Sequence, residues 1–137
     1  MLDTQAAVFA FYAGTLGLLL LILSVITVRV RLRTRTMIGD GGKNDLIKAQ
    51  RAHGNASEYI PTALVLLVVL VFLNAPIWLM HLVGGSLLLG RCMHAYGLLT
   101  STGVTRGRFL GMVLTWMSLL TGALAALAGA FSPLLFS

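Results

Sequence analysis

Four long apolar stretches constrain this chain more than any other feature, because each is long enough to cross a membrane as a helix. A transmembrane helix needs about 20 mostly apolar residues. Short polar segments separate the four stretches, which lie within residues 5–36, 44–73, 77–99 and 106–131. Only 10% of the residues are charged, whereas soluble domains carry about 25%. We therefore expect an all-α membrane protein, a single domain over residues 1–137 built as a four-transmembrane-helix bundle.

The positive charges gather in two segments of the sequence. Seven of the ten Lys and Arg residues lie in residues 29–51, and Arg106 and Arg108 stand at the start of the fourth apolar stretch. Short loops rich in Lys and Arg tend to stay on the cytoplasmic side of a membrane. We therefore expect loops 36–50 and 101–107 to be cytoplasmic and both termini to lie outside. Several of these arginines need no role beyond setting the topology or contacting anionic lipid headgroups.

An unusual set of polar side chains lies near the start of the second apolar stretch. One helical face carries a basic, an amide, an acidic and a hydroxyl group at the spacing i, i+4, i+7 and i+11: Arg51, Asn55, Glu58 and Thr62. Ionisable residues inside a bilayer are costly and usually face the bundle interior or a water-filled cavity. This face is the leading candidate site, and a purely structural clamp between helices is the alternative interpretation.

The other predicted helices bring polar side chains to the same basic end of the bundle: Arg31, Arg91, His94, Tyr96, Arg106 and Arg108. This convergence indicates a shared site. The excess of arginine favours an anionic ligand, because guanidinium groups bind carboxylates bidentately. Glu58 would neutralise an arginine or bind a ligand ammonium group. No metal site is predicted, because the sequence has a single Cys and no ligand spacing of His, Cys and carboxylates.

Three short motifs of this sequence resemble the MAPEG family, the membrane-associated proteins in eicosanoid and glutathione metabolism. The most specific is the second-helix motif Arg51-Ala52-His53-x-Asn55-x-x-Glu58-Tyr59-x-Pro61. Val30-Arg31-Leu32-Arg33 resembles the end of the family's first helix, and Arg91-x-x-His94 resembles the third helix of its prostaglandin E synthase branch. The resemblance covers essentially the whole chain and points to the small bacterial members. It implies a homotrimer in the bacterial inner membrane, with glutathione bound at each subunit interface toward the cytoplasmic side.

The resemblance also implies roles for individual residues. The implied glutathione contacts are Arg51, Asn55, Glu58 and Tyr59 of the second helix, Arg31 of the first, and Arg91 and His94 of the third. A basic residue at the start of the fourth helix is implied as the group that stabilises the thiolate. We take this residue to be Arg108, with Arg106 as the alternative. The prostaglandin branch carries a tyrosine where this chain has Leu98, and Tyr96, on a different face, is the candidate substitute.

The leading functional hypothesis is a glutathione transferase or peroxidase that acts on lipophilic electrophiles. Its expected partners are other copies of the chain, membrane lipids and a small lipophilic substrate, with no nucleic acid. One alternative is a non-catalytic homologue that binds lipid or acts as a scaffold. Another is a small four-span exporter of cationic drugs centred on Glu58, but the surrounding arginines disfavour a cation site.

Overall fold

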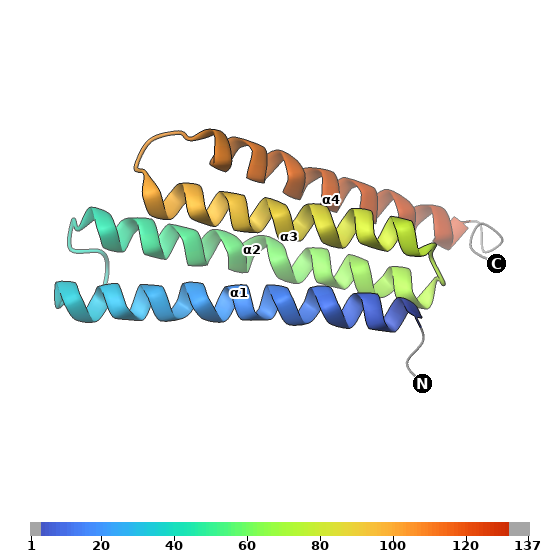
Figure 1. The fold of residues 1–137 in the computed structure, drawn as a ribbon, viewed down its shortest axis with the longest axis horizontal. Coiled ribbons are helices and arrows are strands. Elements are labelled where there is room, and N and C mark those ends of the chain that lie inside the picture. The colour runs from blue at the N-terminus through green and yellow to red at the C-terminus, as the bar shows by residue number, and fades with distance from the viewer. Residues whose placement is uncertain (1–3, 132–137) are drawn as a thin grey trace.

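The protein is a bundle of four antiparallel helices, described here from a computed structural model that places residues 4–131 (Figure 1). The helices are α1 (Thr4–Thr34), α2 (Asn44–Phe72), α3 (Ile77–Thr100) and α4 (Arg106–Phe131). Each is long and apolar enough to cross a membrane. The prediction of an all-helical four-span architecture is therefore confirmed.

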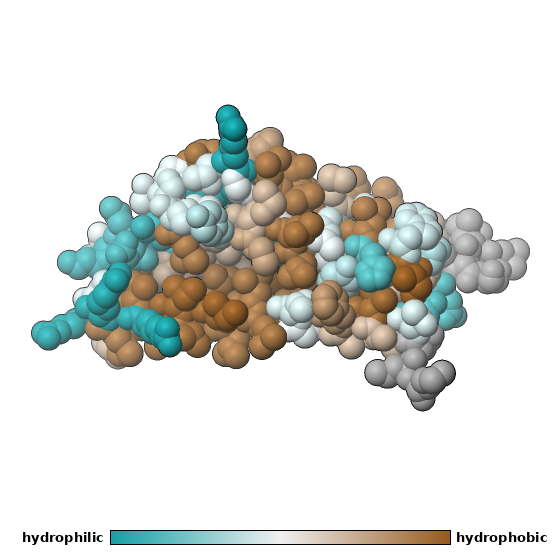
Figure 2. Space-filling model, viewed as in Figure 1, coloured by the Kyte–Doolittle hydropathy of each residue, from teal (hydrophilic) through white to brown (hydrophobic). Residues whose placement is uncertain are grey.

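The α1–α2 and α3–α4 loops lie at one end of the bundle, and the α2–α3 turn lies at the other (Figure 1). Figure 2 shows hydrophilic side chains gathered at the first of these ends, which we call the basic end, and an apolar surface along much of the bundle. The apolar surface is what a lipid environment requires, because exposed apolar side chains there contact acyl chains rather than water.

Helix α1 ends two residues earlier than the sequence predicted, at Thr34 instead of residue 36. Arg35 turns the chain out of the helix with a φ of 52°. That left-handed conformation is common at helix ends, where it lets the next amide close the last turn. Here the amide of Thr36 donates to the carbonyl of Arg31 at 3.1 Å. The remaining predicted boundaries differ by one residue or none.

Helices α2 and α3 form the middle of the bundle, since each packs against all the others, while α1 and α4 do not touch. Helix α3 has half of its most apolar segment buried, the largest share of the four. The core is built from fully buried aliphatic side chains such as Leu16, Leu67, Met80 and Leu87. The polar end of α3 is thereby placed between α2 and α4.

A stripe of small residues lets α4 approach α3 closely. The sequence predicts this stripe from Gly111, Thr115, Ser118, Gly122 and Ala126, and the structure buries the first four. A Cβ atom added to Gly111 would lie 2.6 Å from the carbonyl oxygen of Gly90 and 2.7 Å from the amide nitrogen of His94. Close helix contacts through small residues are typical of membrane proteins. This contact fixes the spacing of the two helices beside the candidate site.

Candidate functional site

A cavity of about 490 Å³ opens between α2, α3 and α4 near the basic end. Helix α2 supplies most of its wall, α3 supplies an imidazole and a leucine, and α4 supplies a guanidinium and a thioether. The lining residues are Gln50, Arg51, Gly54, Asn55, Glu58, His94, Leu98, Arg108 and Met112. Cavities of roughly 300–1,000 Å³ with a few convergent polar groups are typical of small-molecule sites. Five of the residues predicted from the sequence therefore line one cavity.

The α2 wall carries two opposite charges that the chain itself leaves unpaired. Arg51 and Glu58 are both exposed. Among residues 4–131, neither has an ion-pair partner, and neither side chain makes a hydrogen bond. Gly54 lies between them, and a Cβ atom there would meet nothing within 4 Å, so the wall is open at this point. These two charged side chains are free to bind a ligand.

His94 and Arg108 form the opposite wall. His94 is 7% exposed, and its Nδ1 lies 3.1 Å from the backbone carbonyl oxygen of Arg108. The backbone amide of Arg108 donates to Oγ1 of Thr105 at 3.2 Å, and its guanidinium donates to the carbonyl of Gly103. Arg108 is thus anchored at the first turn of α4 with its charge beside the cavity.

Arg106 points elsewhere, which separates the two candidates for the thiolate-stabilising role. Two positions along a helix correspond to a rotation of about 200°. Arg106 accordingly lines a separate apolar groove with Val104, Phe109 and Leu110. Only Arg108 of the pair lines the polar cavity.

Arg91 lies behind the cavity and not in its wall. Its side chain is among the most deeply buried in the chain, at 1% exposure. Its Nη1 donates to Asn55 Oδ1 at 2.6 Å, and its Nε donates to Thr115 Oγ1 at 2.9 Å. The guanidinium also lies 5.2 Å from the centre of the Tyr59 ring, a cation–π distance. Arg91 therefore ties α2, α3 and α4 together with neutral partners, and Tyr59 takes part in that cluster instead of lining the cavity.

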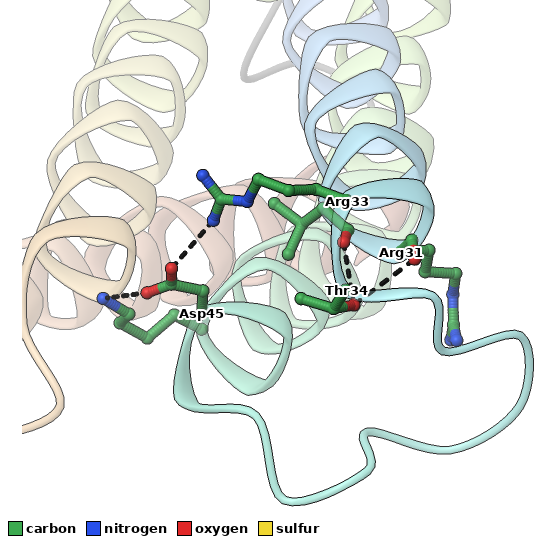
Figure 3. Close-up of polar contacts among 6 residues, drawn as sticks. Arg31, Arg33, Thr34 and Asp45 are labelled. Atoms are coloured by element: carbon green, nitrogen blue, oxygen red, sulfur yellow. Dashed lines mark hydrogen bonds and ion pairs between the residues drawn. The ribbon is translucent and has the colours of Figure 1, made fainter.

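Two further predicted residues lie away from the cavity within one chain. Arg31 donates to the carbonyls of Thr36, Met37 and Gly39 in the α1–α2 loop. Figure 3 shows its side chain directed away from Asp45, which Arg33 reaches across from α1 at 2.8 Å. Tyr96 is 71% exposed on α3, because two positions separate it from His94 and turn it to another face.

Comparison with known proteins assigns the chain to a family. The sequence model of the MAPEG family matches residues 9–128. The chain belongs to the MAPEG family. It is also 44% identical over 120 residues to the protein called "Inner membrane protein YecN" in Escherichia coli strain K12, and equally to the protein of that name in Escherichia coli O6:H1. These alignments cover 88% of this chain and 90% of each relative. No solved structure matches the chain significantly.

The MAPEG match spans the cavity completely, since every lining residue falls inside it. Four lining residues were not predicted as site residues from the sequence: Gln50, Gly54, Leu98 and Met112. Gly54, Leu98 and Met112 each stand three or four positions from a predicted residue, which is one turn along the same helical face, whereas Gln50 directly precedes Arg51. Extending every predicted polar position by one turn would have found these three but not Gln50, and none of the four carries a charge to mark it.

Proposed function

We propose that this MAPEG protein is a membrane-bound glutathione transferase or peroxidase that acts on lipophilic electrophiles. The observation that carries the proposal is the cavity with two arginines, one carboxylate, two amides and one imidazole. Glutathione has two carboxylates, one ammonium group and a thiol. Arg51 and Arg108 match the carboxylates or the thiolate, and Glu58 matches the ammonium group.

Arg108 is the residue we propose for activating the thiol. The thiolate is the nucleophile, and a free thiol has a pKa near 8.5. Lowering the pKa of the bound thiol by about two units requires roughly 2.7 kcal/mol of selective stabilisation of the thiolate. One guanidinium group in a partly dehydrated cavity is able to supply that stabilisation. The apolar substrate would reach the thiolate laterally from the membrane.

We further propose that the protein works as a homotrimer. Glu58 and Arg51 are exposed on an apolar helix of the single chain. Charged groups at such positions are expected to face a protein interior or a cavity and not lipid. A second copy packed over this face would enclose both charges. In such an assembly Arg31 and Tyr96, which lie away from the cavity of their own chain, would be available to a neighbouring one.

We place the protein in the inner membrane, as the name of its Escherichia coli relatives suggests. Both termini would lie outside, and the loops 36–50 and 101–107 would lie in the cytoplasm, where glutathione is available. Reporter fusions at residue 137 test this topology. A cytoplasmic C-terminus would contradict it.

Glutathione binding measured by calorimetry in nanodiscs tests the proposed function. We expect wild type to bind glutathione and Glu58→Gln to bind it at least about 10-fold more weakly, which is about 1.4 kcal/mol. Asp45→Asn is the matched control, because Asp45 pairs with Arg33 and Lys48 outside the cavity. The control should bind as wild type does. No binding by wild type at millimolar glutathione would sink the proposal.

One observation favours a second candidate, a non-catalytic homologue that binds lipid or acts as a scaffold. Arg91 already uses Asn55 and Thr115 as a clamp between three helices, so part of the polar cluster has a structural task. A conjugation assay with a generic aryl halide separates the two candidates. Turnover that depends on Arg108 supports the enzyme, and binding without turnover supports the scaffold.

A further inference from the structure

The hydrogen bond between His94 and Arg108 determines which ring nitrogen carries the proton. Nδ1 of His94 lies 3.1 Å from a backbone carbonyl oxygen, and a carbonyl oxygen only accepts hydrogen bonds. Nδ1 must therefore carry the hydrogen. In the neutral imidazole this leaves Nε2 with a lone pair and no proton.

Nε2 of His94 is accessible and has no hydrogen-bond partner in the described part of the chain. Every fully buried side-chain nitrogen or oxygen within residues 4–131 does have a partner. An atom without a partner is therefore not sealed in the core. His94 lines the cavity, so the accessible Nε2 of its ring is available as an acceptor for a ligand bound there.

We propose that His94 accepts the proton of the bound thiol, an inference that rests on the proposed function. The S–H bond breaks, its electron pair stays on sulfur, and the proton forms a new N–H bond at Nε2. Arg108 then holds the thiolate, while the imidazolium keeps its Nδ1–H bond to the Arg108 carbonyl. The proton leaves to water through the open side of the cavity, and the ring returns to its neutral form.

The charges around the ring suit a transient base. Arg51 and Glu58 of α2 and Arg108 of α4 line the same cavity, and Arg91 of α3 lies close behind it. No charged side chain of α1 lines it. The arginines disfavour a lasting imidazolium and favour the thiolate. The proton is therefore passed on, and the negative charge stays on sulfur.

His94→Asn tests this role, because the asparagine amide nitrogen takes the place of Nδ1 and is able to donate to the Arg108 carbonyl but cannot take up a proton. We expect glutathione affinity within about 2-fold of wild type and the same final ultraviolet thiolate signal at pH 7, reached more slowly after mixing. Conjugation at pH 7 should fall about 10²-fold, the lower part of the usual range for a general base. The difference in conjugation rate between the variant and wild type should shrink as pH rises past 8.5, where the free thiol ionises unaided.

His53→Asn is the matched control, since His53 is a half-buried histidine of α2 outside the cavity lining. It should keep the thiolate signal and the rate of wild type. A His94→Asn protein that binds glutathione and forms the thiolate as fast as wild type overturns the role of His94 alone. So does a rate deficit that is the same at every pH, which is the mark of a structural defect. Failure of wild type to bind glutathione overturns the proposed function and this inference together.

Discussion

The Gly111→Ala substitution tests how closely α3 and α4 pack beside the cavity. The new Cβ would lie 2.6 Å from the carbonyl oxygen of Gly90, whereas ordinary contact begins at 3.4 Å. Because the obstructing atoms belong to the backbone, the helices must separate by about 0.8 Å, which is a form of overpacking. Overpacking a tight interface costs about 1–3 kcal/mol.

The same separation affects the buried guanidinium. The bond from Arg91 Nε to Thr115 Oγ1 spans this interface at 2.9 Å. A 0.8 Å separation would lengthen it to about 3.7 Å, beyond hydrogen-bonding range. A lost bond to a charged group adds about 1.5–3 kcal/mol. We therefore expect Gly111→Ala to lower the free energy of unfolding by about 2.5–6 kcal/mol.

Reversible unfolding in mixed micelles, followed by the fluorescence of Trp78 and Trp116, measures this free energy. Gly17→Ala is the control, because a Cβ atom at Gly17 meets nothing within 4 Å. The control should be as stable as wild type or up to about 1 kcal/mol more stable, because alanine is the better helix former. If Gly111→Ala is as stable as the control, the close α3–α4 packing described above is refuted.

Three further predictions follow from individual contacts. Arg108→Ala should lower conjugation about 10²-fold, while Arg106→Ala, in the separate groove, should leave the rate within about 2-fold of wild type; equal losses would contradict the assignment. Asn55→Ala removes the 2.6 Å acceptor of the buried guanidinium and should lower the free energy of unfolding by about 1.5–3 kcal/mol in the same micelle titration. Tyr12→Phe removes the 2.9 Å bond from its hydroxyl to Nδ1 of His81 and should lower that free energy by about 0.5–1.5 kcal/mol, with an unchanged value arguing against the bond.

The four helices could be predicted from the sequence because each apolar stretch exceeds the thickness of a bilayer. What hydropathy does not encode is the local backbone at a helix end. Arg35 ends α1 with a φ of 52°, and nothing about an arginine side chain predicts that conformation. The end of α1 was therefore the least accurate boundary.

The α2 face of the cavity could also be predicted, because helical periodicity places Arg51, Asn55 and Glu58 together. Periodicity alone does not say how deep a side chain lies behind that face. Arg91 was predicted to contact the ligand together with the lining residues. Only the packing of the helices shows that Asn55 and Thr115 hold its guanidinium in the core. Leu98 and Met112 were missed for the opposite reason, since they line the cavity without any polar group to mark them.

The charges of the polar cluster fall into two groups with different needs. The charge of Arg91 is satisfied inside the chain by neutral oxygens, a thioether and an aromatic ring. The charges of Arg51 and Glu58 are not satisfied, since neither side chain has an ion-pair partner in the part of the chain that the structure describes. Leaving two charges uncompensated on an apolar helix is costly in a membrane. The cost falls if a zwitterionic ligand or a second copy of the chain covers α2, so ligand binding and assembly should stabilise each other at this face.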